Sequence, residues 1–182
     1  AGVPGCIKNG IDEQTANKIY DEMIDFAKYA FNKSHAAAYA VVSYQTAWLK
    51  YYFPVEYMAA LMTSVIDNPS KVSEYIYACR QMNIKILPPD INKGEANFSV
   101  DGGDIRYGLA AIKSIGRPVI KAIVEDREEL GLFQNLEDFI TRLSAKNILN
   151  KRTIENLIKA GALDTLGGTR KQFMSIYVQI VD

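Results

Sequence analysis

The stretch from Phe31 to Phe53 reads FNKSHAAAYAVVSYQTAWLKYYF, and the rest of the chain is organised around it. It begins with small polar residues and the single histidine of the chain, His35, and continues into a long apolar run. Ser34 is the predicted N-cap of a helix, because its hydroxyl can accept a hydrogen bond from a free amide one turn later. The alanines that follow favour the helix. Pro54 ends it, because the residue before a proline avoids helical angles.

Apolar side chains cover most of the circumference of this predicted helix, so we expect most of it to be buried. Its polar residues fall within one sector of roughly 80° on a helical projection. They are His35, Tyr39, Ser43, Thr46 and Lys50. This sector is either the exposed edge of a core helix or a surface that faces an anionic ligand. Because a helix N-terminus carries free amides and about half a positive charge, and Lys33 adds a full charge, phosphate is the anion that the second interpretation favours.

The segment from Phe26 to Thr46 reads FAKYAFNKSHAAAYAVVSYQT and resembles the fingers region of the alpha subunit of bacterial C-family replicative DNA polymerases, the DNA polymerase III family. The similarity continues through Trp48–Lys50, Pro54, Tyr57–Ala60 and Ile86–Asn92, and it ends with Gly161–Asp164. It therefore covers nearly the whole chain. The family usually has glycines on both sides of the tyrosine before the motif. This chain has Lys28 and Ala30 there, which leaves the motif itself intact.

The resemblance implies that part of this segment contacts the triphosphate of an incoming deoxynucleoside triphosphate. The nucleotide-binding candidates are Asn32, Lys33, Ser34, His35 and Lys50. Lys33 would neutralise phosphate charge, and His35 would donate a hydrogen bond to a phosphate oxygen. Lys50 is the most distant candidate, about 22 Å from His35 along a helix that rises 1.5 Å per residue.

The overall composition allows one large or two small domains. The chain has 182 residues, 48% of them hydrophobic, and a net charge of zero. With no net charge, any contact with nucleic acid must come from local basic patches. Cys6 and Cys79 have no paired spacing, so we expect no metal site and a cytoplasmic protein. We find no signal peptide or membrane span. The chain starts at Ala1, which fits a fragment of a longer parent.

The sequence predicts a mainly α fold in three regions. Residues 1–82 form a helical bundle, the fingers portion, with helices that begin at Asp12, Pro54 and Asn68. Residues 83–108 form a connector with short strands and a β-hairpin, since two β-prone runs flank the glycine-rich turn at residues 101–104. Residues 109–182 form a helical region that contains a helix-hairpin-helix element, with later helices capped by Asn135 and Asn150.

Residues 109–124 read LAAIKSIGRPVIKAIV and resemble a helix-hairpin-helix motif: a short helix, a tight turn built on Gly116, and a second helix opened by Pro118. Amides near Gly116 can approach a phosphate because glycine has no side chain in the way. The DNA-binding candidates are Lys113, Ser114, Ile115, Gly116, Arg117 and Lys121. The alternative is an ordinary helical turn with a solvated charged face.

A second run without acidic residues extends from Phe139 to Ile154. Its basic residues are Arg142, Lys146, Lys151 and Arg152. This run either extends the DNA-binding surface or forms a solvated helix end.

By this resemblance, the chain is part of a DNA-directed DNA polymerase, a nucleotidyltransferase. The fingers would contact the incoming nucleotide, and the helix-hairpin-helix would hold the template-primer duplex. Magnesium is expected in the parent polymerase, at carboxylates of a palm that this chain lacks. We therefore expect no catalytic residue, metal or cofactor in this chain, and no polymerisation by the chain alone.

The expected partners are the template-primer duplex, deoxynucleoside triphosphates and the rest of the polymerase chain. Through the parent they also include the sliding clamp and other holoenzyme subunits, with no membrane. The competing interpretation is a stand-alone DNA-binding or scaffold module without sequence specificity and without a nucleotide role. A nuclease or lyase is disfavoured, because the sequence shows no carboxylate cluster and no second histidine for acid–base work.

Overall fold

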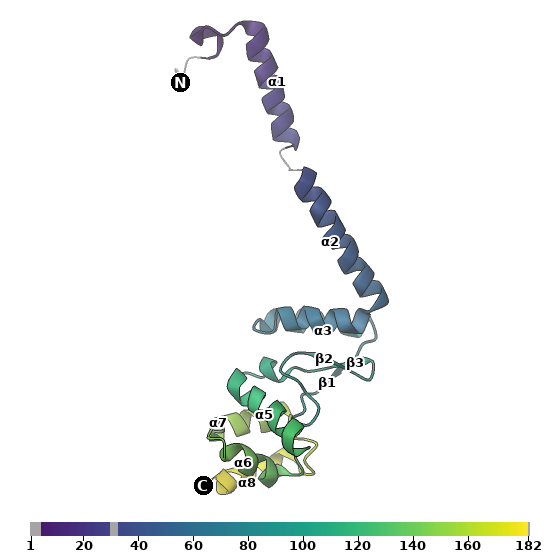
Figure 1. Ribbon diagram of the computed structural model, residues 1–182, viewed down its shortest axis with the longest axis vertical. Coiled ribbons are helices and arrows are strands. Elements are labelled where there is room, and N and C mark those ends of the chain that lie inside the picture. The colour runs from purple at the N-terminus through teal and green to yellow at the C-terminus, as the bar shows by residue number, and fades with distance from the viewer. Residues whose placement is uncertain (1–4, 30–32, 182) are drawn as a thin grey trace. The chain divides into compact units, whose positions relative to one another are not determined.

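The computed structural model describes residues 5–29 and 33–181 (Figure 1). These residues form eight α-helices and one three-stranded sheet. The mainly α fold class is therefore confirmed, including the small β element and the helical region after it. The chain divides into two compact units, Ala1–Trp48 and Leu49–Asp182.

The first unit contains a 3-10 turn, η1 (Ile7–Asn9), the helix α1 (Glu13–Tyr29) and most of α2 (Lys33–Tyr52). Asp12 caps α1 as predicted, since its Oδ1 accepts the amide of Thr15 at 2.9 Å. This backbone hydrogen bond lowers the pKa of Asp12. Because α2 already begins at Lys33, Ser34 lies inside its first turn. The prediction that Ser34 is the N-cap was therefore wrong.

The apolar side chains of α2 are largely exposed. Tyr44 is 70% exposed and Tyr51 is 78% exposed. The apolar circumference had predicted a buried helix, and that prediction is wrong for the contacts that this chain makes by itself. Composition shows that a helix surface is apolar, but it does not show which segment covers that surface.

The second unit begins with two helices, α3 (Pro54–Ser64) and α4 (Pro69–Gln81). Each has a proline in its first turn, where a missing amide costs no helical hydrogen bond. Asn68 caps α4, since its Oδ1 accepts the amide of Lys71 at 3.2 Å. The buried face of α3 packs against the sheet and against α4. This first hydrophobic cluster includes Met58, Met62, Val72, Cys79, Phe98 and Ile105.

The sheet has three short strands: β1 (Ile86–Leu87), β2 (Ser99–Asp101) and β3 (Asp104–Arg106). Its order is β1-β3-β2, with β3 parallel to β1 and antiparallel to β2. Gly102 and Gly103 form the turn between β2 and β3 at φ values of 63° and 94°, a left-handed region that glycine adopts without a steric penalty. The predicted hairpin is therefore confirmed, and β1 adds a parallel edge strand.

The remaining elements are a 3-10 turn, η2 (Leu109–Ala111), and four helices: α5 (Arg117–Leu130), α6 (Leu136–Ser144), α7 (Lys151–Ala160) and α8 (Arg170–Val181). Asn135 and Asn150 cap α6 and α7 as predicted, each accepting an amide three residues later at 2.9 and 2.8 Å. The α5–α8 helices enclose a second hydrophobic cluster (lower part of Figure 1). Its fully buried members include Ile123, Phe139, Leu143, Ile154 and Leu157.

A buried carboxylate, Asp126 in α5, connects this helix to α6. Arg142 Nε donates to its Oδ2 at 2.7 Å, and Lys146 Nζ lies 2.8 Å from its Oδ1. The Arg142 guanidinium also donates to the carbonyl of Gly131 and stacks on the ring of Phe133. Burial alone would raise the pKa of Asp126, but the Lys146 ammonium and the Arg142 guanidinium together hold it below its ordinary value of 3.8. Asp126 is therefore ionised at neutral pH.

We expect Asp126→Asn to lower the free energy of unfolding by about 3 kcal/mol, because it leaves two cations without their buried counter-ion. Urea unfolding at pH 7 measures this loss. Since the pKa of Asp126 is lower in the folded state, its stabilisation is present above pH 3.8 and disappears as the pH falls through the folded-state pKa. The difference between wild type and variant should therefore shrink at low pH.

The matched control is Glu128→Gln, which changes an exposed acid on the same helix. It should alter the unfolding free energy by no more than about 0.5 kcal/mol. An equal effect of the two substitutions would show that Asp126 does not hold α5 to α6.

Candidate nucleic-acid interface

The predicted DNA-binding turn lies between η2 and α5, at residues 112–116. Ser114 reverses the chain with a left-handed φ of 65°, which costs a residue other than glycine about 1–2 kcal/mol. Gly116 has a φ of −73° and is the N-cap of α5. A Cβ there would meet only Pro118 Cδ, at an ordinary 3.6 Å. The prediction that the turn is built on Gly116 was therefore wrong, since Ser114 makes the reversal.

Free backbone donors gather at this turn. The amides of Val119 and Ile120 both donate to the carbonyl of Gly116, at 3.0 and 3.3 Å. Within the described part of the chain, the amides of Ser114, Gly116 and Arg117 have no hydrogen-bond acceptor. They lie beside the N-terminus of α5, where the helix dipole is positive. The turn can therefore donate several hydrogen bonds to one anion.

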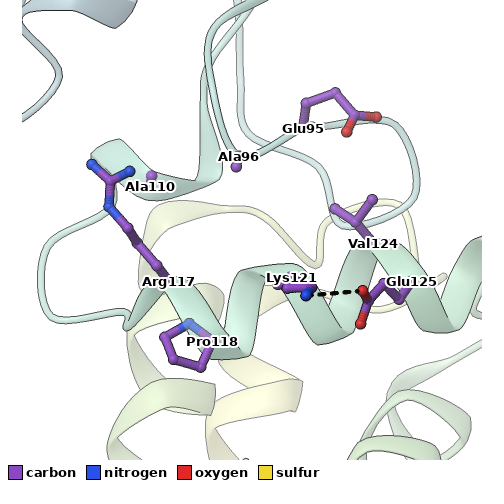
Figure 2. A pocket seen from close by; sticks show the side chains of 8 residues that line it. All are labelled: Glu95, Ala96, Ala110, Arg117, Pro118, Lys121, Val124 and Glu125. Atoms are coloured by element: carbon purple, nitrogen blue, oxygen red, sulfur yellow. Dashed lines mark ion pairs between the residues drawn. The ribbon is translucent and has the colours of Figure 1, made fainter.

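Three exposed cationic side chains lie on this turn and on the first turns of α5: Lys113, Arg117 and Lys121. Arg117 lies 3.6 Å from Asp67, and Lys121 lies 3.5 Å from Glu125. Figure 2 shows Arg117 and Lys121 on the first turns of α5. Exposed ion pairs of this kind are weak. A phosphate can therefore replace either carboxylate.

The structure restricts what two of the sequence-based interpretations can mean. Ile115 is buried in the second hydrophobic cluster, so only its backbone can contact a ligand. In the second basic run, Arg142 and Lys146 are both bound to Asp126. Lys146 is exposed at the surface although it pairs with Asp126, and Lys151 and Arg152 are exposed at the start of α7. The acid that binds Arg142 and Lys146 precedes the run along the chain, which is why the run looked free of acids.

The five residues of the predicted polar sector of α2 are all exposed, as are the apolar residues around them. The ring centroids of His35 and Tyr39 lie 4.3 Å apart, and the hydroxyl of Thr46 donates to the carbonyl of Ser43 at 2.9 Å. Lys50 is exposed in the last turn. Asn32 lies outside the described residues, and the structure describes only the backbone of Lys33.

Within residues 5–29 and 33–181, no three Asp, Glu, His or Cys side chains come together as ligands for a metal ion. No helix in this described part is both long enough and apolar enough to span a membrane.

Comparison with protein families bears directly on the turn. The family described as "Helix-hairpin-helix motif" matches residues 83–173, which is half of the chain. This chain belongs to the helix-hairpin-helix family. The matched region contains the sheet, the 112–116 turn and α5–α7. The helix-hairpin-helix interpretation made from residues 109–124 is therefore confirmed at the level of the family.

Nearly the whole chain is also similar to curated DNA polymerase III alpha subunits. It is 51% identical to that of Vibrio cholerae over 94% of this chain, and 49% identical to that of Pseudomonas aeruginosa over 99%. It is 45% identical to that of Thermus aquaticus over 96%. The resemblance to the C-family polymerase alpha subunit is therefore confirmed. The chain spans about 15% of the length of these relatives.

The backbone of the helix-hairpin-helix turn predicts opposite responses at two neighbouring positions. Ser114→Val should lower the free energy of unfolding by about 1–2 kcal/mol, because a β-branched residue is strained in the left-handed region. Gly116→Ala should cost less, no more than about 1 kcal/mol, because the added methyl meets no obstacle and the cost is only that of a poorer N-cap. Urea unfolding of both variants tests this. A larger loss for Gly116→Ala than for Ser114→Val would restore Gly116 as the residue that makes the turn.

Proposed function

We propose that this chain is a segment of a replicative DNA polymerase, and that its 112–116 turn holds the backbone of the template-primer duplex during template-directed DNA synthesis. The proposal rests on one observation: backbone amides without an acceptor and three exposed cations occur together at the N-terminus of α5. The cations are Lys113, Arg117 and Lys121. The family match and the similarity to DNA polymerase III alpha subunits support the same role.

The chemistry of the turn favours contact with phosphates rather than bases. Backbone amides and long cations bind phosphate oxygens, which are the same at every nucleotide. Between Leu109 and Val124 there is no asparagine, glutamine or acidic side chain, the residue types that read adenine or cytosine. Arginine and lysine can read guanine, but here Arg117 and Lys121 lie beside free backbone amides, a combination that suits a phosphate. Binding should therefore be independent of sequence, as a polymerase that copies any template requires.

If Lys113, Arg117 and Lys121 neutralise three phosphates, the logarithm of the affinity should fall with log salt at a slope of roughly −2.7. Arg117→Ala should change this slope to roughly −1.8 and weaken binding equally on two duplexes of unrelated sequence. Fluorescence anisotropy across a salt series measures both quantities. Lys171→Ala, which removes an exposed cation from α8, is the matched control and should leave the slope unchanged. A loss confined to one duplex would contradict contact through the backbone alone.

We also propose that the start of α2 contacts the triphosphate of the incoming nucleotide. The similarity of residues 26–46 to the polymerase fingers supports this role, as does the polar sector that begins at His35. Asn32, Lys33 and Ser34 would complete the contact, and Lys50 would act farther along the helix. The alternative is a DNA-binding module without any nucleotide role, in which α2 has a structural function only.

In this proposal, catalysis belongs to the parent enzyme. Magnesium and its palm carboxylates would lie outside this chain, and the chain alone would incorporate no nucleotide. The sliding clamp and the other holoenzyme subunits would be reached through the parent, in the cytoplasm.

Titration with a deoxynucleoside triphosphate should shift the ring signals of His35, the single histidine of the chain. Nuclear magnetic resonance detects this shift without ambiguity. Lys33→Ala should abolish the shift, because the charge beside the phosphates is lost. Lys18→Ala, which removes an exposed cation of α1, should leave it intact. Unchanged ring signals, both here and with the palm segment attached, would favour the module without a nucleotide role.

A further inference from the structure

A cavity of 560 Å³ opens beside the turn, between α5 and the segment that leads into η2 (Figure 2). This volume lies within the range of about 300–1,000 Å³ that is typical of sites for small molecules. Its apolar lining consists of Ala96, Ala110, Pro118 and Val124. Small side chains on both sides leave the space open. The phosphate contacts proposed above use two residues at its edge, Arg117 and Lys121, but not this apolar lining.

Four charged side chains also line the cavity: the cations Arg117 and Lys121, and the acids Glu95 and Glu125. They differ in how firmly they are engaged. Glu95 forms an ion pair with Arg127, whose side chain is only 8% exposed. Arg127 also donates to the carbonyls of Ile91 and Gly94, so Glu95 has a partner that is fixed in place.

The two cations have looser partners. Lys121 and Glu125 face each other in one exposed pair on α5, drawn in Figure 2, at 3.5 Å. Arg117 has a 3.6 Å pair with Asp67, which does not line the cavity. Exposed pairs of this length exchange easily for another anion. The charge that the cavity can offer to a ligand is therefore positive.

We propose that this cavity binds a small amphipathic anion, an apolar body that carries one carboxylate. The apolar body would pack against Ala96, Ala110 and Val124. The carboxylate would replace Glu125 at Lys121 and would accept from the Arg117 guanidinium, whose planar donors match a carboxylate. A neutral apolar ligand would leave both cations with their weak partners and would bind less well.

Because Arg117 and Lys121 also belong to the proposed duplex contact, the ligand and the duplex would exclude each other. This exclusion rests on the proposed function, whereas binding in the cavity does not. A ligand of this class would therefore act as an inhibitor of duplex binding.

The test uses 2-naphthoate as the anionic probe, and the methyl signals of Val124 as a reporter inside the cavity. Titration should shift these signals to saturation. The neutral amide of the same shape, 2-naphthamide, should bind about tenfold more weakly, since it lacks the charge that strengthens the hydrogen bonds. Unchanged Val124 signals, or equal affinity for the two probes, would overturn the proposal.

Ala96→Phe fills the cavity from an exposed position and should abolish the shift of Val124. Ala145→Phe makes the same change at an exposed alanine that does not line the cavity, and should preserve the shift. Unaltered methyl signals of the core residue Ile123 would show that both variants are folded. A naphthoate shift of Val124 that survives Ala96→Phe would overturn the proposal.

A second titration adds duplex DNA before 2-naphthoate and separates the two proposals. Loss of the Val124 response to 2-naphthoate would support exclusion. If the duplex binds and the full response persists, exclusion is wrong although the cavity is occupied. If the duplex does not bind at all, the proposed function fails, while the probe's own titration still decides the cavity.

Discussion

The buried charge of Asp126 is the interaction on which the functional part of this structure depends. This carboxylate is on the buried side of α5. Arg142 in α6 and Lys146, two residues after the end of α6, both bind it. The 112–116 turn leads into the N-terminus of α5, and one wall of the cavity lies along the side of this helix. A buried ion pair adds little net stability, but removing one partner is strongly destabilising because the other charge is then left buried and uncompensated. The pair therefore constrains the positions of the two segments that carry it. It fixes where α5 lies, and so where the turn amides point.

Local signals made much of the fold predictable from the sequence. Four helix caps could be predicted, because a capping hydrogen bond joins residues only three positions apart and depends on local sequence alone. They are Asp12, Asn68, Asn135 and Asn150. The glycine pair at residues 102–103 fixed the hairpin for a similar reason. The sequence motif at residues 109–124 also gave the correct family.

What the sequence did not reveal depends on contacts between distant residues or on backbone angles. A glycine in a turn suggests a left-handed residue, yet here Ser114 adopts that conformation and Gly116 does not. The basic run at residues 139–154 contains no acidic residue, yet two of its cations form ion pairs with Asp126, which lies outside the run. The apolar circumference of α2 predicted burial, but which surface covers a helix depends on its neighbours rather than on its own composition.

The central claim is that the turn binds DNA through its backbone amides, and amide chemical shifts test it most directly. Duplex DNA should shift the amide signals of Ser114, Gly116 and Arg117 more than those of other residues, because these donors gain an acceptor. The pattern should be the same for two duplexes of unrelated sequence. Shifts that leave these three amides unchanged and appear instead at the start of α7, or that differ between the duplexes, would contradict the account.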